Sequence, residues 1–206
     1  MKGKSYWRMR KKKEGKVWLS GKPDLYSYKL SSWIHKKFFK KGGKLLDLGC
    51  GKLLFLNSFK KLGYDVKGCD VEPLDLKIQK VDLEKDKFPY PDNHFDFIFC
   101  RNVIEHLLSA DNMFRESFRV LKPGGKILIM TADAYYWDSF RNLMNHYDHK
   151  KLYTLNSVVE GLMMFKFEII EKRHFRNFPF FWKYTDLAFE LVYPSVINFI
   201  VVGEKN

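Results

Sequence analysis

Apolar positions along this chain of 206 residues follow two different periods, and the change between them falls at Gly42-Gly43. Before the glycine pair, apolar residues recur every three or four positions and lysines occupy the rest of the turn, which predicts one amphipathic helix. Pro23-Asp24 has the residue types that begin a helix, and the two glycines have the type that ends one. The apolar positions of this helix are Tyr26, Leu30, Trp33, Ile34 and Phe38.

After Gly43, short apolar runs alternate with amphipathic stretches, which is typical of a parallel sheet whose strands are joined by helices. Helices are expected at Leu53–Leu62, Ala110–Leu121 and Leu155–Phe165. Lys122-Pro123-Gly124-Gly125 is predicted to be a turn that leads into the fifth strand. The expected strands are Lys44–Leu48, Asp65–Asp70, Gln79–Asp82, Phe95–Cys100, Lys126–Thr131, Phe167–Arg173 and Val196–Val202.

The chain carries a formal net charge of +13, and that excess is confined to its N-terminal part. Residues 1–44 contain 15 of the 37 Lys and Arg residues but 2 of the 24 Asp and Glu residues, so residues 45–206 are neutral overall. Hydrophobic residues make up 46% of the chain and aromatic residues 17%, which excludes a disordered chain. We therefore expect a basic N-terminal extension with a capping helix over residues 1–44, followed by a globular domain over residues 45–206.

Cysteine usage and the apolar runs indicate the setting of the chain. Cys50, Cys69 and Cys100 are too few for a disulfide framework and do not have the spacing of a zinc site. We therefore expect a reducing, cytoplasmic setting and no bound metal. The basic N-terminus has no apolar stretch of the kind found in signal peptides. No apolar run approaches the roughly 20 residues that a membrane-spanning helix needs, so no transmembrane segment is expected.

The candidate chemistry begins at Leu45–Gly51, where an apolar strand enters a turn with two glycines and an apolar helix follows. Glycines allow backbone torsions that other residues avoid and let a ligand approach the main chain closely, and the helix start offers unpaired N–H groups. Asp70 ends the second strand nineteen residues after Gly51, where such folds place a carboxylate that accepts hydrogen bonds from ribose hydroxyls. The pattern therefore predicts a ligand that contains a nucleoside.

Two residues distinguish between the cofactors that use such a site. A dinucleotide site requires G-x-G-x-x-G, but Leu54 stands where the third glycine should be. Asp47, two residues before the first glycine, would repel a pyrophosphate, whereas it suits a ligand that carries an amino group beside a sulfonium. The sequence therefore favours a positively charged nucleoside over a pyrophosphate.

Four short motifs follow one another along the chain: Asp47-Leu48-Gly49-Cys50-Gly51, Gly68-Cys69-Asp70-Val71-Glu72-Pro73, Phe95-Asp96-Phe97-Ile98 followed by Glu105-His106-Leu107, and Arg119-Val120-Leu121-Lys122-Pro123-Gly124-Gly125. Together they resemble the ordered motifs of the class I S-adenosylmethionine-dependent methyltransferases. The resemblance covers about Leu45 to Thr131 and implies S-adenosyl-L-methionine as the cofactor. It also implies a doubly wound, Rossmann-like α/β fold, with a mostly parallel seven-stranded sheet, an antiparallel C-terminal strand and helices on both faces.

The resemblance implies a role for each matched residue around that cofactor. One position departs from the family pattern, because Leu53 stands where the family usually has a third glycine. A cofactor-binding but non-catalytic partner subunit is therefore kept as an alternative. Asp47, Gly49, Cys50 and Gly51 would hold the amino-acid end of the cofactor, Asp70 the ribose hydroxyls, Val71 the adenine ring, Asp82 and Leu83 the adenine amino group, and Arg101 and Asn102 the methionine moiety beside the reaction centre.

Candidate proton-transfer residues follow the fourth strand, where acceptor and cofactor are expected to meet. Glu105, His106 and His149 are the candidate catalytic bases, and a base is needed only where the acceptor loses a proton during attack. Packing of His106 against the cofactor or a helix is the alternative for that residue. His146, Asp148, His149 and Tyr153 form a polar and aromatic cluster after the fifth strand, where the family builds its substrate site.

The expected acceptor is a small molecule, such as a saccharide or a lipid-linked compound, methylated at an O, N or C atom. The connection between the second and third strands is short and no RNA-binding module is appended. RNA is the alternative acceptor, because basic and aromatic residues interleave within residues 1–44 and suit phosphates and bases. An anionic membrane surface would suit them equally, and a solubilising tail is the plainest interpretation. No pattern indicates an oligomeric state.

Overall fold

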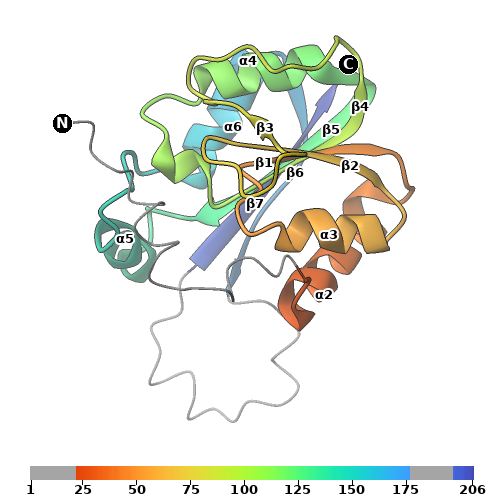
Figure 1. The fold of residues 1–206 in the computed structure, drawn as a ribbon. Coiled ribbons are helices and arrows are strands. Elements are labelled where there is room, and N and C mark those ends of the chain that lie inside the picture. Colours follow the sequence, from red (N-terminus) through yellow and green to blue (C-terminus); the bar gives the residue numbers. More distant parts are fainter. Residues whose placement is uncertain (1–21, 177–196) are drawn as a thin grey trace, which may run out of the picture.

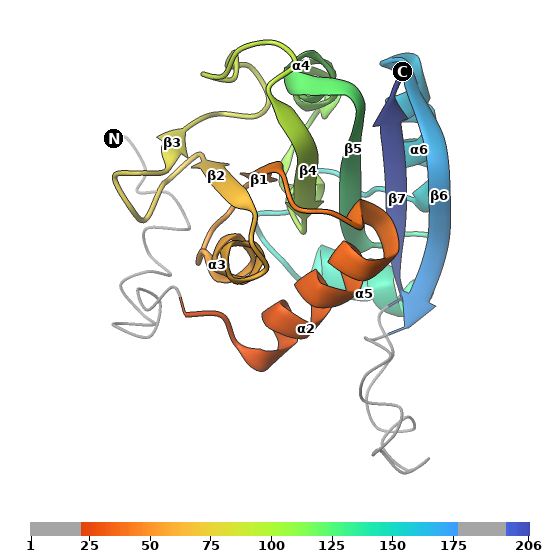
Figure 2. The same ribbon diagram turned by 90° about the vertical axis from the view of Figure 1, so that its right-hand side faces the viewer.

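Seven strands form one sheet in the computed structural model, which describes residues 22–176 and 197–206. Their order across the sheet is β3-β2-β1-β4-β5-β7-β6. Strand β7 runs antiparallel to both of its neighbours, and the other paired strands are parallel (Figure 2). The expected fold is thereby confirmed. The strands are β1 Lys44–Leu48, β2 Asp65–Asp70, β3 Gln79–Lys80, β4 Phe95–Arg101, β5 Leu121–Ala132, β6 Phe167–Arg176 and β7 Ile197–Lys205.

Helices cover both faces of this sheet, as Figures 1 and 2 show. Helices α2 and α3 pack together on one face, and α4 and α6 lie on the other. Helix α5 follows β5 and lies at the end of the sheet (Figure 1). No described helix is long and apolar enough to cross a membrane. The helices are α2 Leu25–Ile34, continued by the π-helical η2 His35–Phe39, then α3 Leu54–Lys61, the short η3 Ile104–His106, α4 Asp111–Val120, α5 Trp137–Met144 and α6 Leu155–Met164.

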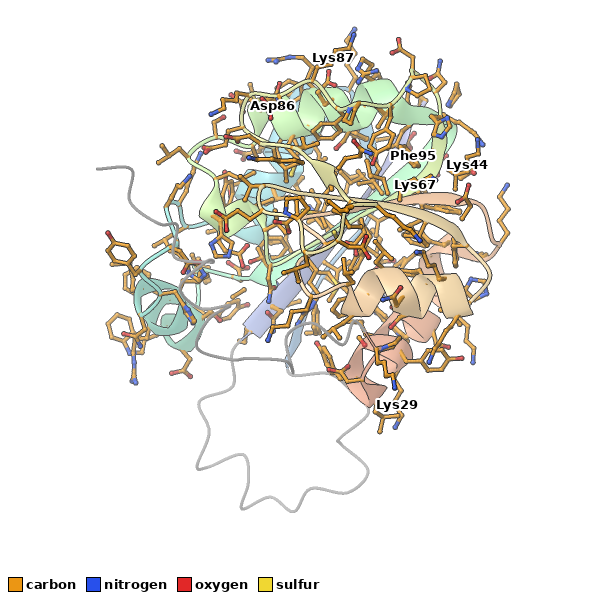
Figure 3. The ribbon with its side chains drawn as sticks, in the orientation of Figure 1. Lys29, Lys44, Lys67, Asp86, Lys87 and Phe95 are labelled. Atoms are coloured by element: carbon orange, nitrogen blue, oxygen red, sulfur yellow. The ribbon has the colours of Figure 1, made fainter. Side chains whose placement is uncertain are left out.

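Alternate residues of the central strands supply two hydrophobic cores, one on each face of the sheet. This alternation follows from the pleat, because successive side chains of a strand point to opposite faces. Phe95, at the start of β4, points into the interior, whereas Lys29 of α2 projects outward (Figure 3). The α4–α6 face buries Leu46, Leu48, Ile98, Ile127 and Ile129, and the α2–α3 face buries Leu45, Phe97, Phe99, Leu128 and Met130.

Helix α2 belongs to the core on the α3 side. It begins where the sequence predicts, because the side chain of Asp24 accepts a hydrogen bond from the Ser27 N–H at 2.6 Å. In η2, the ring of Phe39 stacks on that of Phe97 with centroids 4.3 Å apart. The helical segment ends at Lys40, whose φ of 63° is left-handed, and thus ends before the predicted glycine pair. The fully buried residues of α2 include Leu30 and Ile34.

Some elements differ from the predicted ones. The segment Lys122–Gly125 is not a turn, because β5 already starts at Leu121 and pairs with Phe95 there. The register shifts between Phe95 and Phe97, so the glycines of this segment accommodate a bulge within β5. Strand β3 is shorter than predicted, since Val81 lies beyond it and its N–H donates to the Asp70 carbonyl. Residues 1–21, which hold much of the predicted basic extension, lie outside the described residues.

Candidate functional site

A cavity of about 960 Å³ opens at the carboxyl ends of β1, β2 and β4. These three strands are parallel neighbours, so the residues that follow them meet at one edge of the sheet. Asp47, Cys50, Glu105 and His149 do not line the cavity. The predicted site residues that line it are Gly49, Gly51, Asp70, Val71, Asp82, Leu83, Arg101, Asn102 and His106.

The glycine turn after β1 takes a backbone shape that side chains would prevent. Gly49 has a φ of +64°, and a Cβ atom there would lie 2.5 Å from Cγ2 of Val103. Gly51 has a φ of +42°, and its N–H donates to Oδ2 of Asp70 at 2.9 Å. The other oxygen of Asp70 accepts the Glu72 N–H at 2.9 Å. The turn therefore holds the Asp70 carboxylate in one orientation at the cavity wall.

Asp47 is a buried carboxylate directly before the glycine turn. Its side chain is 3% exposed, and within the described part of the chain its Oδ2 atom has no hydrogen-bond partner. Burial and the nearby charge of Asp70 raise the pKa of Asp47 well above its usual value. A buried carboxylate oxygen without a partner is unfavourable, and a cationic group beside it would offset that cost. Asp47 therefore fits the ammonium end of S-adenosylmethionine.

The loops after β2 and β3 form the wall that the sequence assigns to adenine. Val71 is an apolar side chain that is 47% exposed, whereas Leu83 is buried. Asp82 accepts the Glu84 N–H at 3.1 Å and pairs with Lys85 at 2.9 Å. Burial alone would raise the pKa of Asp82, but these contacts outweigh it and hold the pKa below its usual value. Asp82 is therefore an ionised acceptor within a turn that it also stabilises.

The end of β4 is held by contacts from α2 and α3. The guanidinium of Arg101 donates to the Tyr26 hydroxyl at 3.2 Å and lies 5.0 Å from the centroid of the Phe55 ring. Asn102 has a φ of 51°, a left-handed conformation that Asn tolerates better than most residues. Its N–H donates to the Met130 carbonyl of β5 at 2.8 Å. Residues far apart in the sequence thus fix this cavity wall.

The three candidate catalytic residues lie together, although the sequence separates Glu105 and His106 from His149. Rings of His106 and His149 have centroids 4.8 Å apart. Nδ1 of His106 lies 3.1 Å from Oδ2 of Asp148, a residue that also lines the cavity. Burial raises the pKa of the Glu105 carboxyl, and burial lowers the pKa of His149. Of the associated cluster residues, His146 stacks on His149, whereas Tyr153 is buried and does not line the cavity.

Several charged residues of the cavity wall were not predicted. Glu84 accepts the Leu108 N–H at 2.6 Å and pairs with Lys150 at 3.0 Å, which joins two loops across the cavity. These residues carry no motif, and their pairing spans 66 positions, so sequence inspection offers no signal for it. The other unpredicted charged residues that line the cavity are Lys52 and Glu72.

The cysteines do not form a reactive site. Cys50, Cys69 and Cys100 are all buried free thiols. Burial raises the pKa of each thiol, with neighbouring carboxylates adding to the effect, so all three stay protonated at neutral pH. They act as small core side chains.

The fold and this cavity together define an α/β protein of the nucleoside-binding type, with a carboxylate at the end of β2 and a glycine turn after β1. Residues 24–179 match the family model described as a methyltransferase domain. That match covers more than half of the chain, so the chain belongs to this methyltransferase family, whose class I members use S-adenosylmethionine.

Curated and solved relatives agree with that membership. The chain is 28% identical over 167 residues to a ubiquinone/menaquinone biosynthesis C-methyltransferase of Pasteurella multocida, which covers 68% of this chain and 62% of the relative. It is 31% identical over 112 residues to phosphoethanolamine N-methyltransferase 2 of Caenorhabditis elegans, covering 47% of this chain and 26% of the relative. The chain thus spans less than two thirds of the length of either curated relative.

Among solved structures, the fold is similar to that of a SAM-dependent methyltransferase from Archaeoglobus fulgidus. The TM-score is 0.70 and the sequence identity is 16%, over 87% of this chain and 94% of that protein. At this level of identity, the similarity shows that the two proteins share a fold.

Proposed function

We propose that this protein transfers the methyl group of S-adenosylmethionine to a small-molecule acceptor. One observation carries the proposal: Asp47 is buried, its Oδ2 has no partner among the described residues, and it directly precedes the glycine turn that lines the cavity. The carboxylate suits a cationic nucleoside, and the fixed Asp70 carboxylate suits its ribose. The fit of these residues agrees with the cofactor of the family.

Each part of the cavity would bind one part of the cofactor, which supplies an electrophilic methyl group on a sulfonium. Gly49 and Gly51 of the cavity wall would contact the amino-acid end, and Asp47 and Cys50, which belong to the same turn but do not line the cavity, would lie next to it. Asp70 would accept the ribose hydroxyls, Val71 would pack on adenine, and Asp82 with Leu83 would meet the adenine amino group. Arg101 and Asn102 would border the methionine moiety. Because the protein would hold the acceptor and the methyl group in line, this alignment can lower the activation barrier by about 7–11 kcal/mol.

A small acceptor is favoured by the size of the cavity and by the relatives. The volume of about 960 Å³ is at the upper end of the range for small-molecule sites, which suits a nucleoside cofactor and one compact acceptor. The two curated relatives are named for ubiquinone or menaquinone biosynthesis and for phosphoethanolamine. We place the acceptor beside His106 and Asp148, and a lipid-linked compound or a saccharide is the class to test first.

Calorimetric titration with S-adenosylmethionine and with S-adenosylhomocysteine tests cofactor binding directly. We expect both to bind the full chain with one site each. Correctly folded protein that binds neither would refute the proposal. Methyl transfer to any acceptor by the isolated chain would exclude the alternative of a non-catalytic subunit.

Asp70 provides the sharpest single substitution. In Asp70→Ala, the ribose acceptor and the two backbone hydrogen bonds at Gly51 and Glu72 are lost together, so S-adenosylhomocysteine affinity should fall at least about tenfold, or 1.4 kcal/mol. Asp75→Ala is the matched control, because Asp75 lies in the same loop, is exposed, and its side chain accepts the neighbouring Lys77 N–H at 2.8 Å. Equal affinity of the two variants would contradict the role of Asp70.

A further inference from the structure

Five polar side chains gather beside the cavity without a role in holding the cofactor. Glu105 and His106 come from η3, and His146, Asp148 and His149 come from the loop after α5. One ligand atom each from Glu105, His106 and His149 lies within 4.8 Å of the other two. The cluster therefore combines imidazole nitrogens with a carboxylate oxygen, which is the mixed donor set that transition metals prefer.

Both histidines nearest Glu105 are oriented by acceptors on their Nδ1 side. Nδ1 of His149 lies 2.8 Å from the Leu143 carbonyl oxygen. Nδ1 of His106 lies 3.2 Å from the carbonyl oxygen of Asp148 and 3.1 Å from its carboxylate. Carbonyl oxygens only accept hydrogen bonds, so Nδ1 of each ring carries the proton. A histidine whose Nδ1 donates to a carboxylate or a carbonyl binds a metal through Nε2, which is the arrangement of many metal-binding histidines.

Glu105 supplies an independent indication of a ligand. Its side chain is 4% exposed, and among the described residues Oε2 of Glu105 has no hydrogen-bond partner. Oδ1 of Asp148 is likewise buried and without a partner there. Two buried carboxylate oxygens that lack donors among the described residues, in the same cluster as two imidazoles, form an environment that a cation would stabilise.

We propose that Glu105, His106 and His149 bind one divalent transition-metal ion, and that Asp148 orients His106 as a ligand. A set of two histidines and one glutamate is typical of zinc sites that keep an open position. Magnesium prefers oxygen ligands, so the two imidazoles select against it. The cysteines, which lack the spacing of a zinc site, predict no bound metal, and no local spacing in the sequence connects Glu105 and His106 with His149.

The ion would bind an oxygen atom of the acceptor in its open position. His106 and Asp148 line the cavity, so the ion would face the space that the acceptor fills. This role rests on the proposed function, whereas binding of the ion does not depend on it. An acceptor with a hydroxyl or carbonyl group is then preferred, since such oxygens are ligands for zinc and manganese.

The test uses the full chain without a histidine tag, after treatment with a chelator. Calorimetry with ZnCl₂ should give one site per chain, and MgCl₂ should give no measurable binding. Glu105→Gln and His149→Gln should each weaken zinc binding at least about tenfold. His94→Gln is the control, because His94 lies outside the cluster, and it should keep the wild-type affinity. Binding of S-adenosylhomocysteine, measured without metal, reports that each variant is folded and that the cofactor site is intact.

A second measurement requires no variant. The visible absorption of the cobalt-loaded wild-type protein should show nitrogen and oxygen ligands, without the charge-transfer band of a cysteine thiolate. A thiolate band, absence of zinc binding by the wild-type protein, or equal zinc affinity in all variants would each overturn the proposed site. If metal binds but S-adenosylhomocysteine does not, the metal site stands and the proposed methyl transfer fails.

Discussion

Leu53 stands where the motif resemblance places a third glycine. It precedes α3 with a φ of 63° and a ψ of 13°, the left-handed conformation that glycine adopts without strain. The family glycine is therefore replaced by a leucine that keeps the glycine backbone shape. Its side chain packs against the α2–α3 core, and this contact offsets part of the strain. The departure changes the side chain and leaves the turn itself in place.

Substitution of Leu53 separates the stabilising packing of its side chain from the strain of its left-handed backbone. Ala and Gly both lose the packing of the side chain, but only Gly relieves the left-handed backbone. Leu53→Gly should therefore be more stable than Leu53→Ala by about 1 kcal/mol, the reverse of their order in a helix interior. Urea unfolding of the two variants measures the difference. A more stable Ala variant would show that the turn is not strained at this position.

The buried Asp47 carboxylate should make stability fall as pH rises. Because its pKa is raised in the folded state, folding favours the protonated form, and the loss of stability grows between the unfolded pKa and the raised folded pKa. Asp47→Asn should therefore increase the free energy of unfolding at pH 7 by about 1–3 kcal/mol, and this gain should shrink toward pH 4. Urea unfolding across pH, without ligand, measures it.

The same Asp47→Asn variant should bind S-adenosylmethionine at least about tenfold more weakly, because it removes the negative charge that we propose to lie beside the cofactor's ammonium group. Greater stability with weaker binding is the expected combination. A variant that is less stable than the wild type at every pH would mean that a favourable partner already satisfies Asp47.

At the scale of elements, α2 is a structural part of the sheet domain, although it precedes the first strand. Leu30 and Ile34 are fully buried against the same core as Leu45 of β1, so α2 covers the sheet beside α3. Tyr26, in its first turn, reaches Arg101 at the cavity wall. One helix therefore both covers the hydrophobic core and contacts the candidate site, while the boundary between residues 1–44 and 45–206 stays a prediction.

Two leucines of α2 test this description. Leu30→Ala should lower the free energy of unfolding by about 2–5 kcal/mol, since the fully buried side chain leaves a cavity. Leu25→Ala is the matched control in the same helix, and its side chain is 68% exposed, so its effect should stay within about 0.5 kcal/mol. Chemical denaturation of both variants provides the comparison. Equal effects would mean that α2 is not part of the folded core.

Local sequence patterns predict most of these elements. They fail where the secondary structure of a segment depends on its pairing with a strand that is distant in the sequence. The helix at α3 and the strands β1 and β2 follow from apolar period and glycine position alone. The bulge in β5 does not, because Lys122–Gly125 has the composition of a turn and only its pairing with β4 makes it part of a strand. The same holds for the site: Asp70 is predicted from its spacing to the glycine turn, whereas the contact of His106 with Asp148 spans 42 positions.

At the scale of the whole molecule, charge and candidate chemistry occupy different parts of the chain. Every residue that lines the cavity follows Leu48, where the sequence is neutral overall, and the excess of +13 precedes Leu45. The excess positive charge therefore bears on which partner residues 1–44 bind. RNA and anionic membranes are the two candidate partners to compare.

Deletion of residues 1–16 tests whether the basic segment and the cofactor cavity act independently. It removes 8 Lys and Arg residues and 1 Glu residue, but no residue of the cavity. S-adenosylhomocysteine affinity should stay within about twofold of wild type, which calorimetry measures. Any RNA binding should lose its steep dependence on salt, since that slope reflects the number of phosphate contacts. An RNA affinity with an unchanged salt slope would instead place the contacts on the neutral domain.

Strand β7 determines when the last two pairings of the sheet can form. It follows β6 in the sequence but lies between β5 and β6, with which it forms both ladders. During synthesis, β6 therefore emerges with no strand beside it, and β5 keeps an open edge until β7 arrives. Unpaired edges of this kind invite association between chains. Strand β7, which joins β6 to the other five strands, is the last of the seven to be synthesised, so a nascent chain halted before Ile197 would leave β6 unpaired and the β7-facing edge of β5 open.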